Sequence, residues 1–105
     1  MTTINLTKYG PIISDKSIGN EIYTLIKTNL SKHDLVKLDL VSIKSMATFN
    51  AKQIFGRLYL ELGSNTFFEK LILSNASEDL KIIIQIGIQN ALEDNAAEKE
   101  ENSKI

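Results

Sequence analysis

The chain has 105 residues, enough for one domain whose single core needs no disulfide or metal support. Its hydrophobic share of 43% is typical of a globular domain, and the absence of cysteine excludes disulfides, thiol catalysis and cysteine-based zinc sites. The N-terminus lacks the pattern of a signal peptide, and the longest apolar run is Ile82 to Ile84. We therefore expect a cytoplasmic protein that does not cross a membrane.

Charge is distributed unevenly along the chain, although the net charge is only −1. Residues 93–105 contain five acidic and two basic residues, whereas residues 1–92 contain ten basic and eight acidic residues. So small a positive excess does not form the clustered basic face that nucleic acid requires. We expect a domain over residues 1–92, an acidic and disordered tail over residues 93–105, and no binding of nucleic acid.

The first elements are a short strand and a helix. Ile4 and Leu6 alternate with polar residues before a turn at residues 9–11, which predicts a strand. Ser14 or Asp15 is placed to cap a helix in which apolar residues recur at helical spacing to about residue 31.

The middle of the chain predicts a strand, a helix and a further strand. Leu35 to Leu40 is rich in branched apolar residues and predicts a central strand after a polar connector at residues 31–34. Thr48 or Ser45 is placed to cap a second helix that Gly63 ends. Residues 66–73 then predict a third strand.

The last element starts at Ser77 and fits two patterns. Isoleucines at every second position from Ile82 to Ile88 resemble a strand, but a helical pattern fits more positions over a longer segment. We therefore predict a helix, with Gly87 allowing it to lie close against the sheet. The resulting βαβαβα order predicts a small layered α/β domain with right-handed crossovers.

Residues 37–56, KLDLVSIKSMATFNAKQIFG, resemble the signature of the STAS-like family of unknown function. The similar positions are Leu38-Asp39-Leu40, Ser42-Ile43, Met46 and residues 50–55, with Ser14 and Asn75 agreeing outside the segment. The resemblance implies a STAS-type fold, in which helices pack against a mixed sheet.

The same resemblance suggests a mode of action. In STAS domains of the anti-anti-sigma type, a partner kinase phosphorylates a serine at the start of the helix after the central strand. Phe49 occupies that position here, Thr48 is the nearest hydroxyl, and Lys52-Gln53 replaces an acidic pair of the family. The resemblance therefore favours constitutive binding of a protein partner, such as a regulatory ATPase or kinase. Thr48 is either a helix cap or the candidate phosphosite.

Two groups of candidate site residues follow. Asp39 and Asn75 form a candidate polar site: Asp39 would bind a cation or a basic group, or hydrogen-bond a neighbouring loop, and Asn75 would shape a turn. Phe49 and Met46 form either an exposed apolar contact or part of the core. The predicted partner-binding surface comprises Ser45, Met46, Thr48, Phe49, Asn50 and Lys52.

The sequence offers little for catalysis. His33 is the sole histidine and falls in a polar connector, and the chain has no Gly-rich phosphate loop, nucleophile elbow or metal-ligand spacing. We therefore expect no enzyme, cofactor or metal, but a non-catalytic protein-interaction and regulatory module that binds through the turn and helix start after the central strand. The alternatives are a self-associating adaptor or inhibitor of a mobile element, acting as a homodimer, and a sensor of nucleotides or other small molecules.

Overall fold

The computed structural model describes residues 1–103, with side chains described for residues 1–97. Three strands form one parallel sheet in the order β1-β3-β5, and two short strands form a second parallel pair, β2-β4. The elements are β1 Thr2–Asn5, η1 Thr7–Tyr9, β2 Ile12–Ile13, α1 Lys16–Lys32, β3 Val36–Asp39, β4 Ser45–Met46, α2 Thr48–Ala51, η2 Lys52–Gly56, α3 Arg57–Leu62, α4 Ser64–Lys70, β5 Leu71–Ser74 and α5 Glu78–Ser103. The predicted α/β class is confirmed, although every strand pairing is parallel where a mixed sheet is predicted.

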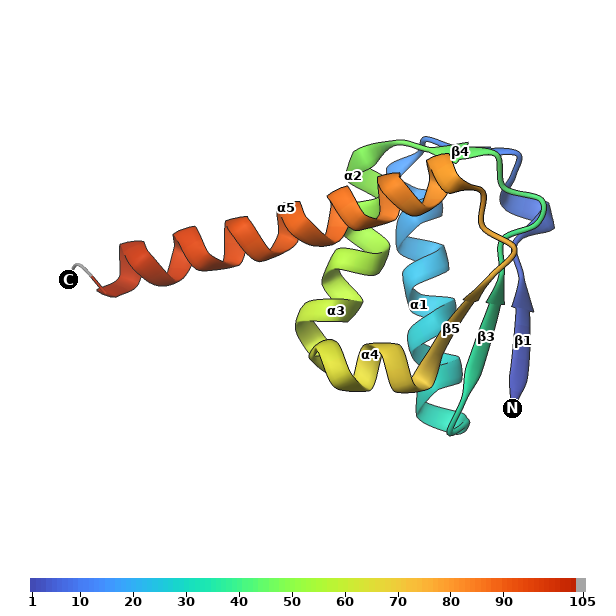
Figure 1. Ribbon diagram of the computed structural model, residues 1–105, viewed down its shortest axis with the longest axis horizontal. Coiled ribbons are helices and arrows are strands. Elements are labelled where there is room, and N and C mark those ends of the chain that lie inside the picture. The colour runs from blue at the N-terminus through green and yellow to red at the C-terminus, as the bar shows by residue number, and fades with distance from the viewer. Residues whose placement is uncertain (104–105) are drawn as a thin grey trace.

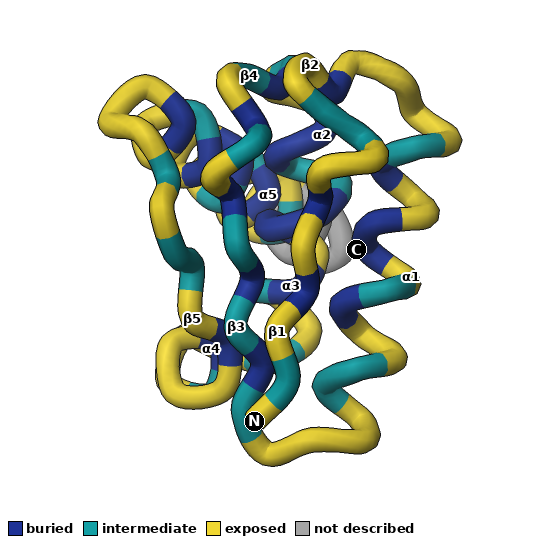
Figure 2. The backbone as a smooth tube through the Cα atoms, turned by 90° about the vertical axis from the view of Figure 1, so that its right-hand side faces the viewer, coloured by how far each residue is buried: buried dark blue, intermediate teal, exposed yellow. Residues whose placement is uncertain are grey.

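The helices cover one face of the three-stranded sheet. Figure 1 shows α1, α2, α3 and α5 on the same side of β1, β3 and β5, and Figure 2 shows the opposite face of these strands turned toward the viewer with no helix in front. Side chains alternate accordingly: Ile4 of β1 and its register partner Leu38 are buried, whereas Thr3 is exposed. The core therefore lies between the sheet and the helices.

Helix α1 matches its prediction closely. Asp15 is its N-cap, and the carboxylate accepts hydrogen bonds from the backbone N–H of Ser17 at 2.8 Å and of Ile18 at 3.2 Å. Ile22 and Ile26, one turn apart on α1, are fully buried in the core. The side-chain hydrogen bond from Ser17, followed by those backbone bonds, lowers the pKa of Asp15.

The prediction of a strand over residues 66–73 is wrong in its first half. Residues 64–70 form α4, and the strand begins only at Leu71. Gly63 ends α3 as predicted, with a positive φ of 82° that redirects the chain straight into α4. Phe67 is buried on this helix while Phe68 is exposed, so packing of one aromatic ring overrides the strand propensity of the Thr-Phe-Phe sequence.

Helix α5 confirms the helical interpretation of the last element. The Ser77 hydroxyl accepts a hydrogen bond from the N–H of Leu80 at 3.1 Å, and the buried stripe follows at helical spacing: Leu80, Ile84, Gly87 and Ala91. The helix continues to Ser103, into the segment predicted to be a disordered tail, because residues 93–103 include four glutamates, two alanines and a lysine and lack glycine and proline. Residues 104–105 of that predicted tail lie outside the described residues.

The end of α5 extends beyond the rest of the domain. Figure 1 shows its C-terminal half projecting away from the sheet and the other helices, and Ala91 is its last buried residue among those whose side chains are described. Over residues 1–103, no helix is both long enough and apolar enough to cross a membrane.

Candidate functional site

The predicted partner-binding segment begins with the small strand β4. Ser45 is half-buried, and Met46 is buried in the core opposite Ile13 of β2. Met46 was predicted to contact a partner, but its place in the second sheet turns it inward. The exposed part of the segment therefore starts only after Ala47.

The start of α2 has no side-chain cap, which corrects a second prediction. Ala47 occupies the N-cap position, Thr48 is the first helical residue, and Ser45 belongs to β4. Thr48 is exposed, and Phe49 beside it is 48% exposed. Neither hydroxyl caps the helix, so Thr48 and Phe49 together present a polar and an aromatic side chain to solvent.

Asn50 was also predicted to contact a partner, but it is completely buried. Its Nδ2 donates to the carbonyl oxygen of Asp15 at 2.9 Å and to Oε1 of Gln53 at 3.2 Å. Gln53 in turn donates through Nε2 to the carbonyl oxygen of Lys16 at 2.8 Å. The two amides fasten the start of α1 to the helix that follows β4, so Asn50 is a structural residue.

A single π-helical stretch interrupts the long helix from Thr48 to Leu62. Residues Lys52 to Gly56 form this stretch, called η2, between α2 and α3. Such interruptions are rare and often lie at functional sites, because they shift the side chains that follow around the helix axis. Here the interruption lies where α5 crosses the helix.

A groove runs between this long helix and α5. It has a volume of about 320 Å³, and its lining consists of Phe49, Lys52, Gln53, Arg57, Leu60, Ala91, Asp94 and Asn95. Phe49 and Leu60 supply exposed apolar surface, since Leu60 is 40% exposed. Lys52 forms an ion pair with Asp94 of α5, joining the two walls. We call this feature the Phe49 groove.

The Phe49 groove includes residues that the sequence pattern did not single out. Leu60 was placed in no predicted surface, and Arg57 and Asp94 were not connected to one another or to Phe49. Leu60 and Arg57 lie eleven and eight positions after Phe49, beyond the π-helical stretch, and all three residues line the groove. The residues that α5 supplies to the groove reach it through a tertiary contact, which no local sequence pattern predicts.

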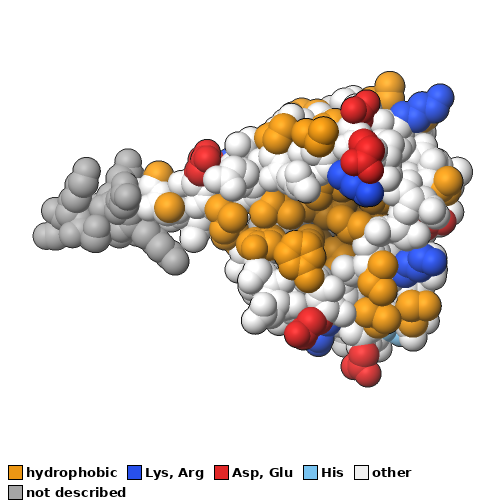
Figure 3. All heavy atoms as spheres, in the orientation of Figure 1, with side chains coloured by type: hydrophobic (Ala, Val, Ile, Leu, Met, Phe, Trp, Pro, Cys, Tyr) orange, Lys and Arg blue, Asp and Glu red, His pale blue; other side chains and the backbone are white. Residues whose placement is uncertain are grey.

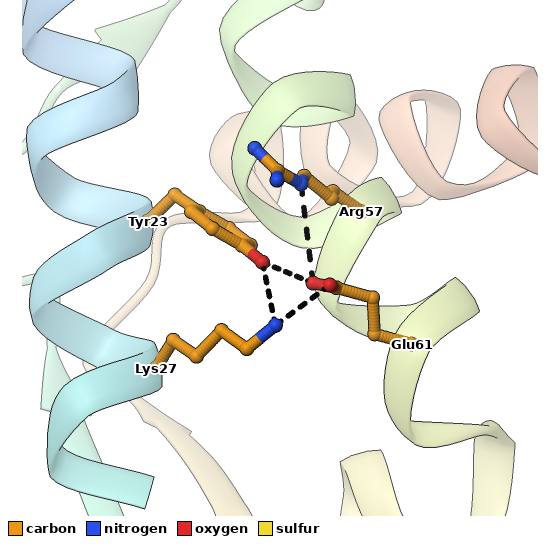
Figure 4. Close-up of polar contacts among 4 residues, drawn as sticks. All are labelled: Tyr23, Lys27, Arg57 and Glu61. Carbon is orange, nitrogen blue, oxygen red and sulfur yellow. Dashed lines mark hydrogen bonds and ion pairs between the residues drawn. The ribbon is translucent and has the colours of Figure 1, made fainter.

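A polar cluster beside the groove was likewise not predicted from the sequence. Figure 4 shows Tyr23 and Lys27 of α1 pointing toward Arg57 and Glu61 of α3. The Tyr23 hydroxyl donates to Oε1 of Glu61, and Lys27 Nζ donates to Oε2 of Glu61 at 2.7 Å and to the Tyr23 hydroxyl at 3.1 Å. The Arg57 guanidinium lies 4.0 Å from the centre of the Tyr23 ring, in a cation–π contact.

Ionisation of this cluster follows from its contacts. Partial burial raises the pKa of Glu61, but hydrogen bonds from Lys27 and Tyr23 outweigh that effect and leave its pKa lowered. The hydrogen bond to Glu61, and then that to Tyr23, raise the pKa of Lys27. The only local signals were the spacings Tyr23–Lys27 and Arg57–Glu61, each of four residues.

The two residues of the predicted polar site do meet at the carboxyl end of the sheet. Oδ1 of Asp39 accepts hydrogen bonds from Nδ2 of Asn75 and from the N–H of Val41, both at 3.1 Å. The hydrogen bond from Asn75, and then that from Val41, lower the pKa of Asp39. Asn75 has a φ of 60° in the left-handed region, which matches its predicted turn role. Asp39 thus hydrogen-bonds neighbouring loops, as one of the predicted alternatives stated.

His33 lies exposed at the C-cap of α1. Among the residues whose side chains are described, no group of three or more His, Cys, Asp or Glu is placed to hold a metal ion.

Comparison with known proteins assigns the fold. A family model described as "STAS-like domain of unknown function (DUF4325)" matches residues 19–81, whereas no curated protein and no solved structure matches the chain. The matched region covers more than half of the chain, from Gly19 in α1 to the first turn of α5, and includes β3, the long helix from Thr48 to Leu62 and β5. The chain therefore belongs to the family of STAS-like domains of unknown function.

Proposed function

We propose that this protein is a non-catalytic regulatory module that binds a partner protein in the Phe49 groove. The observation that carries the proposal is the exposure of Phe49, an aromatic side chain that is 48% exposed and lines a groove. Aromatic residues with a rigid setting dominate the energetics of protein interfaces, and Phe49 is held on a helix whose next residue, Asn50, is locked by hydrogen bonds.

The groove chemistry suits a segment with apolar anchors and a polar rim. Phe49, Leu60 and Ala91 supply apolar lining, and charged groups border it: Lys52, Arg57 and Asp94. A partner helix or loop that inserts an apolar side chain beside Phe49 would exclude water from it, while the bordering charges would fix the orientation of the segment.

Thr48 supplies a means of regulation within the same proposal. Its side chain is exposed next to Phe49 and four residues before Lys52. A phosphate on this hydroxyl would add nearly two negative charges beside the apolar anchor, which would weaken insertion of an apolar side chain. Mass spectrometry after incubation with candidate kinases tests this part, and an unmodified Thr48 would remove it.

The binding proposal is tested with a matched pair of variants. Phe49→Asp changes the groove, and Ile82→Asp places the same charge at an isoleucine of α5 that is 52% exposed and does not line it. Immobilised wild type and both variants are compared as baits in lysate of the source cells by quantitative mass spectrometry. We expect at least one captured protein to fall about 30-fold with Phe49→Asp, corresponding to a hot spot of about 2 kcal/mol, and to remain with Ile82→Asp.

Equal capture by the wild type and Phe49→Asp would refute binding at this groove. Circular dichroism melting of each bait provides the control for folding. A loss that occurs with both variants would point to a general effect of charge on the bait and would also contradict the proposal.

A further inference from the structure

The lining of the Phe49 groove carries one more cation than anion. Lys52 and Asp94 line the groove and neutralise one another in an ion pair. Arg57 lines it as well, and its side chain is 54% exposed. Because these three are the charged members of the lining, the groove keeps a net positive charge at Arg57.

Glu61, one turn after Arg57, does not balance this charge. Its Oε1 lies 3.9 Å from Nε of Arg57, which is longer than a hydrogen bond. Lys27 Nζ donates to Oε2 of Glu61 at 2.7 Å, and the Tyr23 hydroxyl donates to Oε1. One carboxylate therefore serves two cations, and among residues 1–97 no hydrogen bond donated by the Arg57 guanidinium is seen.

Tyr23 supports the guanidinium of Arg57 from α1. The centre of its ring lies 4.0 Å from the guanidinium carbon, as Figure 4 illustrates, and the ring is buried, with Tyr23 only 4% exposed. A planar guanidinium stacked on a fixed ring loses little freedom when it binds a further group. Arg57 is therefore a pre-organised cation in the lining of a partly apolar groove.

This charge distinguishes the Phe49 groove from another apolar area of the domain. Figure 3 shows hydrophobic side chains gathered in the hollow between α5 and the α3–α4 segment. Apolar surface alone does not specify the chemistry of an occupant. In the Phe49 groove, Phe49 and Leu60 share one lining with Arg57, so a complementary occupant places an apolar side chain and an anionic group close together.

We propose that the Phe49 groove binds an acidic and apolar segment of a partner protein, in which the carboxylate of an Asp or Glu pairs with Arg57 beside the apolar anchor. This inference rests on the proposed function and adds the chemistry of the partner. The fork of a guanidinium matches a carboxylate in a bidentate pair. A single excess positive charge suits a carboxylate, which brings one negative charge, better than a phosphate group, which brings nearly two.

Peptide selection with a charge-reversed groove tests the inference. The probe is a phage-displayed library of random peptides of about 12 residues, roughly three helical turns, with the immobilised full-length chain as bait. We expect the wild type to select peptides with Asp or Glu near an apolar residue, and Arg57→Glu to select Lys or Arg there instead. Lys37→Glu is the matched control, because it makes the same change of charge in β3, between the buried Val36 and Leu38, and should select the same acidic peptides as the wild type.

A double-mutant cycle on one selected peptide then measures the pairing. Replacing its Asp or Glu by Asn or Gln should raise the Kd about tenfold with the wild type, as expected for loss of a charge-assisted hydrogen bond, and less than about twofold with Arg57→Gln. Circular dichroism of each variant is the control for folding. Because the peptide is changed as well as the protein, the cycle separates the pairing from any general effect of the Arg57 substitution.

Selected peptides without a preference for acidic residues would overturn the inference, and so would an acidic preference that Arg57→Glu leaves unchanged or that Lys37→Glu reverses. If such peptides are still weakened by Phe49→Asp, the groove remains the binding site and only the partner chemistry is wrong. Peptide binding that Phe49→Asp leaves unchanged would contradict the proposed function as well. Selection of no peptide would overturn the inference alone, because the capture experiment with Phe49→Asp decides the proposed function separately.

Discussion

Gly56 of η2 and Gly87 of α5 lie against one another where the two helices cross. A Cβ atom built on Gly56 would be 2.8 Å from the carbonyl oxygen of Gly87, and one built on Gly87 would be 2.5 Å from the carbonyl carbon of Ala51. Both clashes involve backbone atoms that cannot move aside. The close crossing places α5 along the wall of the Phe49 groove, so the two glycines determine the shape of the candidate site.

We expect Gly87→Ala to destabilise the protein by about 1–3 kcal/mol, because the added methyl group overpacks this crossing. In an open helix the same change would stabilise by about 1 kcal/mol through helix propensity. Urea unfolding measures the difference, with Gln85→Ala on the exposed part of α5 as the control that should not destabilise. A Gly87→Ala variant as stable as the wild type would show that the two helices are not in close contact at Gly87.

Tyr23→Phe removes the hydroxyl that donates to Glu61 and accepts from Lys27, while leaving the ring beneath Arg57. We expect the free energy of unfolding to fall by about 1–2 kcal/mol, since Glu61 loses a hydrogen bond at a partly buried site. Tyr59→Phe is the matched control, because no hydrogen bond of the Tyr59 hydroxyl is seen among the described residues. Chemical denaturation should separate the two variants, and equal stabilities would contradict the bridging role of Tyr23.

Two adjacent phenylalanines in α4 provide a test of its helical packing. Phe67 is buried at 1% exposure, whereas Phe68 is 67% exposed. Phe67→Leu should cost about 1–2 kcal/mol through the cavity that it leaves, and Phe68→Leu should stay within about 0.5 kcal/mol. Thermal unfolding monitored by circular dichroism compares them, and a larger loss at Phe68 would mean that the two rings are exchanged between core and surface.

The Asp39–Asn75 contact predicts a dependence of stability on pH. The pKa of Asp39 is lowered in the folded chain. The ionised carboxylate therefore stabilises the fold fully above the ordinary carboxyl pKa, and this stabilisation is lost as pH falls through the lowered pKa. Asn75→Gly removes the amide but tolerates the positive φ, so the pKa of Asp39 should rise toward its ordinary value.

Carboxyl-carbon NMR titration measures this pKa shift directly. Asp15 is the internal control, since the hydrogen bonds that lower its pKa come from Ser17 and Ile18 and are untouched by Asn75→Gly. An Asp39 titration that is identical in the wild type and Asn75→Gly would exclude the side-chain contact.

Local chemistry in the sequence determined most of the fold. Asp15 at the N-cap of α1, Gly63 at the end of α3 and Ser77 before α5 act through their own backbone neighbourhood, so their positions could be predicted from residue type. Alternation of Ile4 and Leu6 with polar residues likewise predicted β1, and the branched apolar residues of 35–40 predicted β3. The signature around Leu38 to Gly56 identified the STAS-like family that the comparison confirms.

Only the tertiary structure decided which residues of that signature are exposed. Met46 and Asn50 belong to the same short segment as Phe49, but β2 covers the first and the start of α1 binds the second. The first residues of the predicted third strand form α4 instead, because burial of the Phe67 ring outweighs the local strand propensity. The Phe49 groove needs α5, more than thirty residues away in sequence, and contacts at such separation arise from packing of whole elements, which no local pattern encodes.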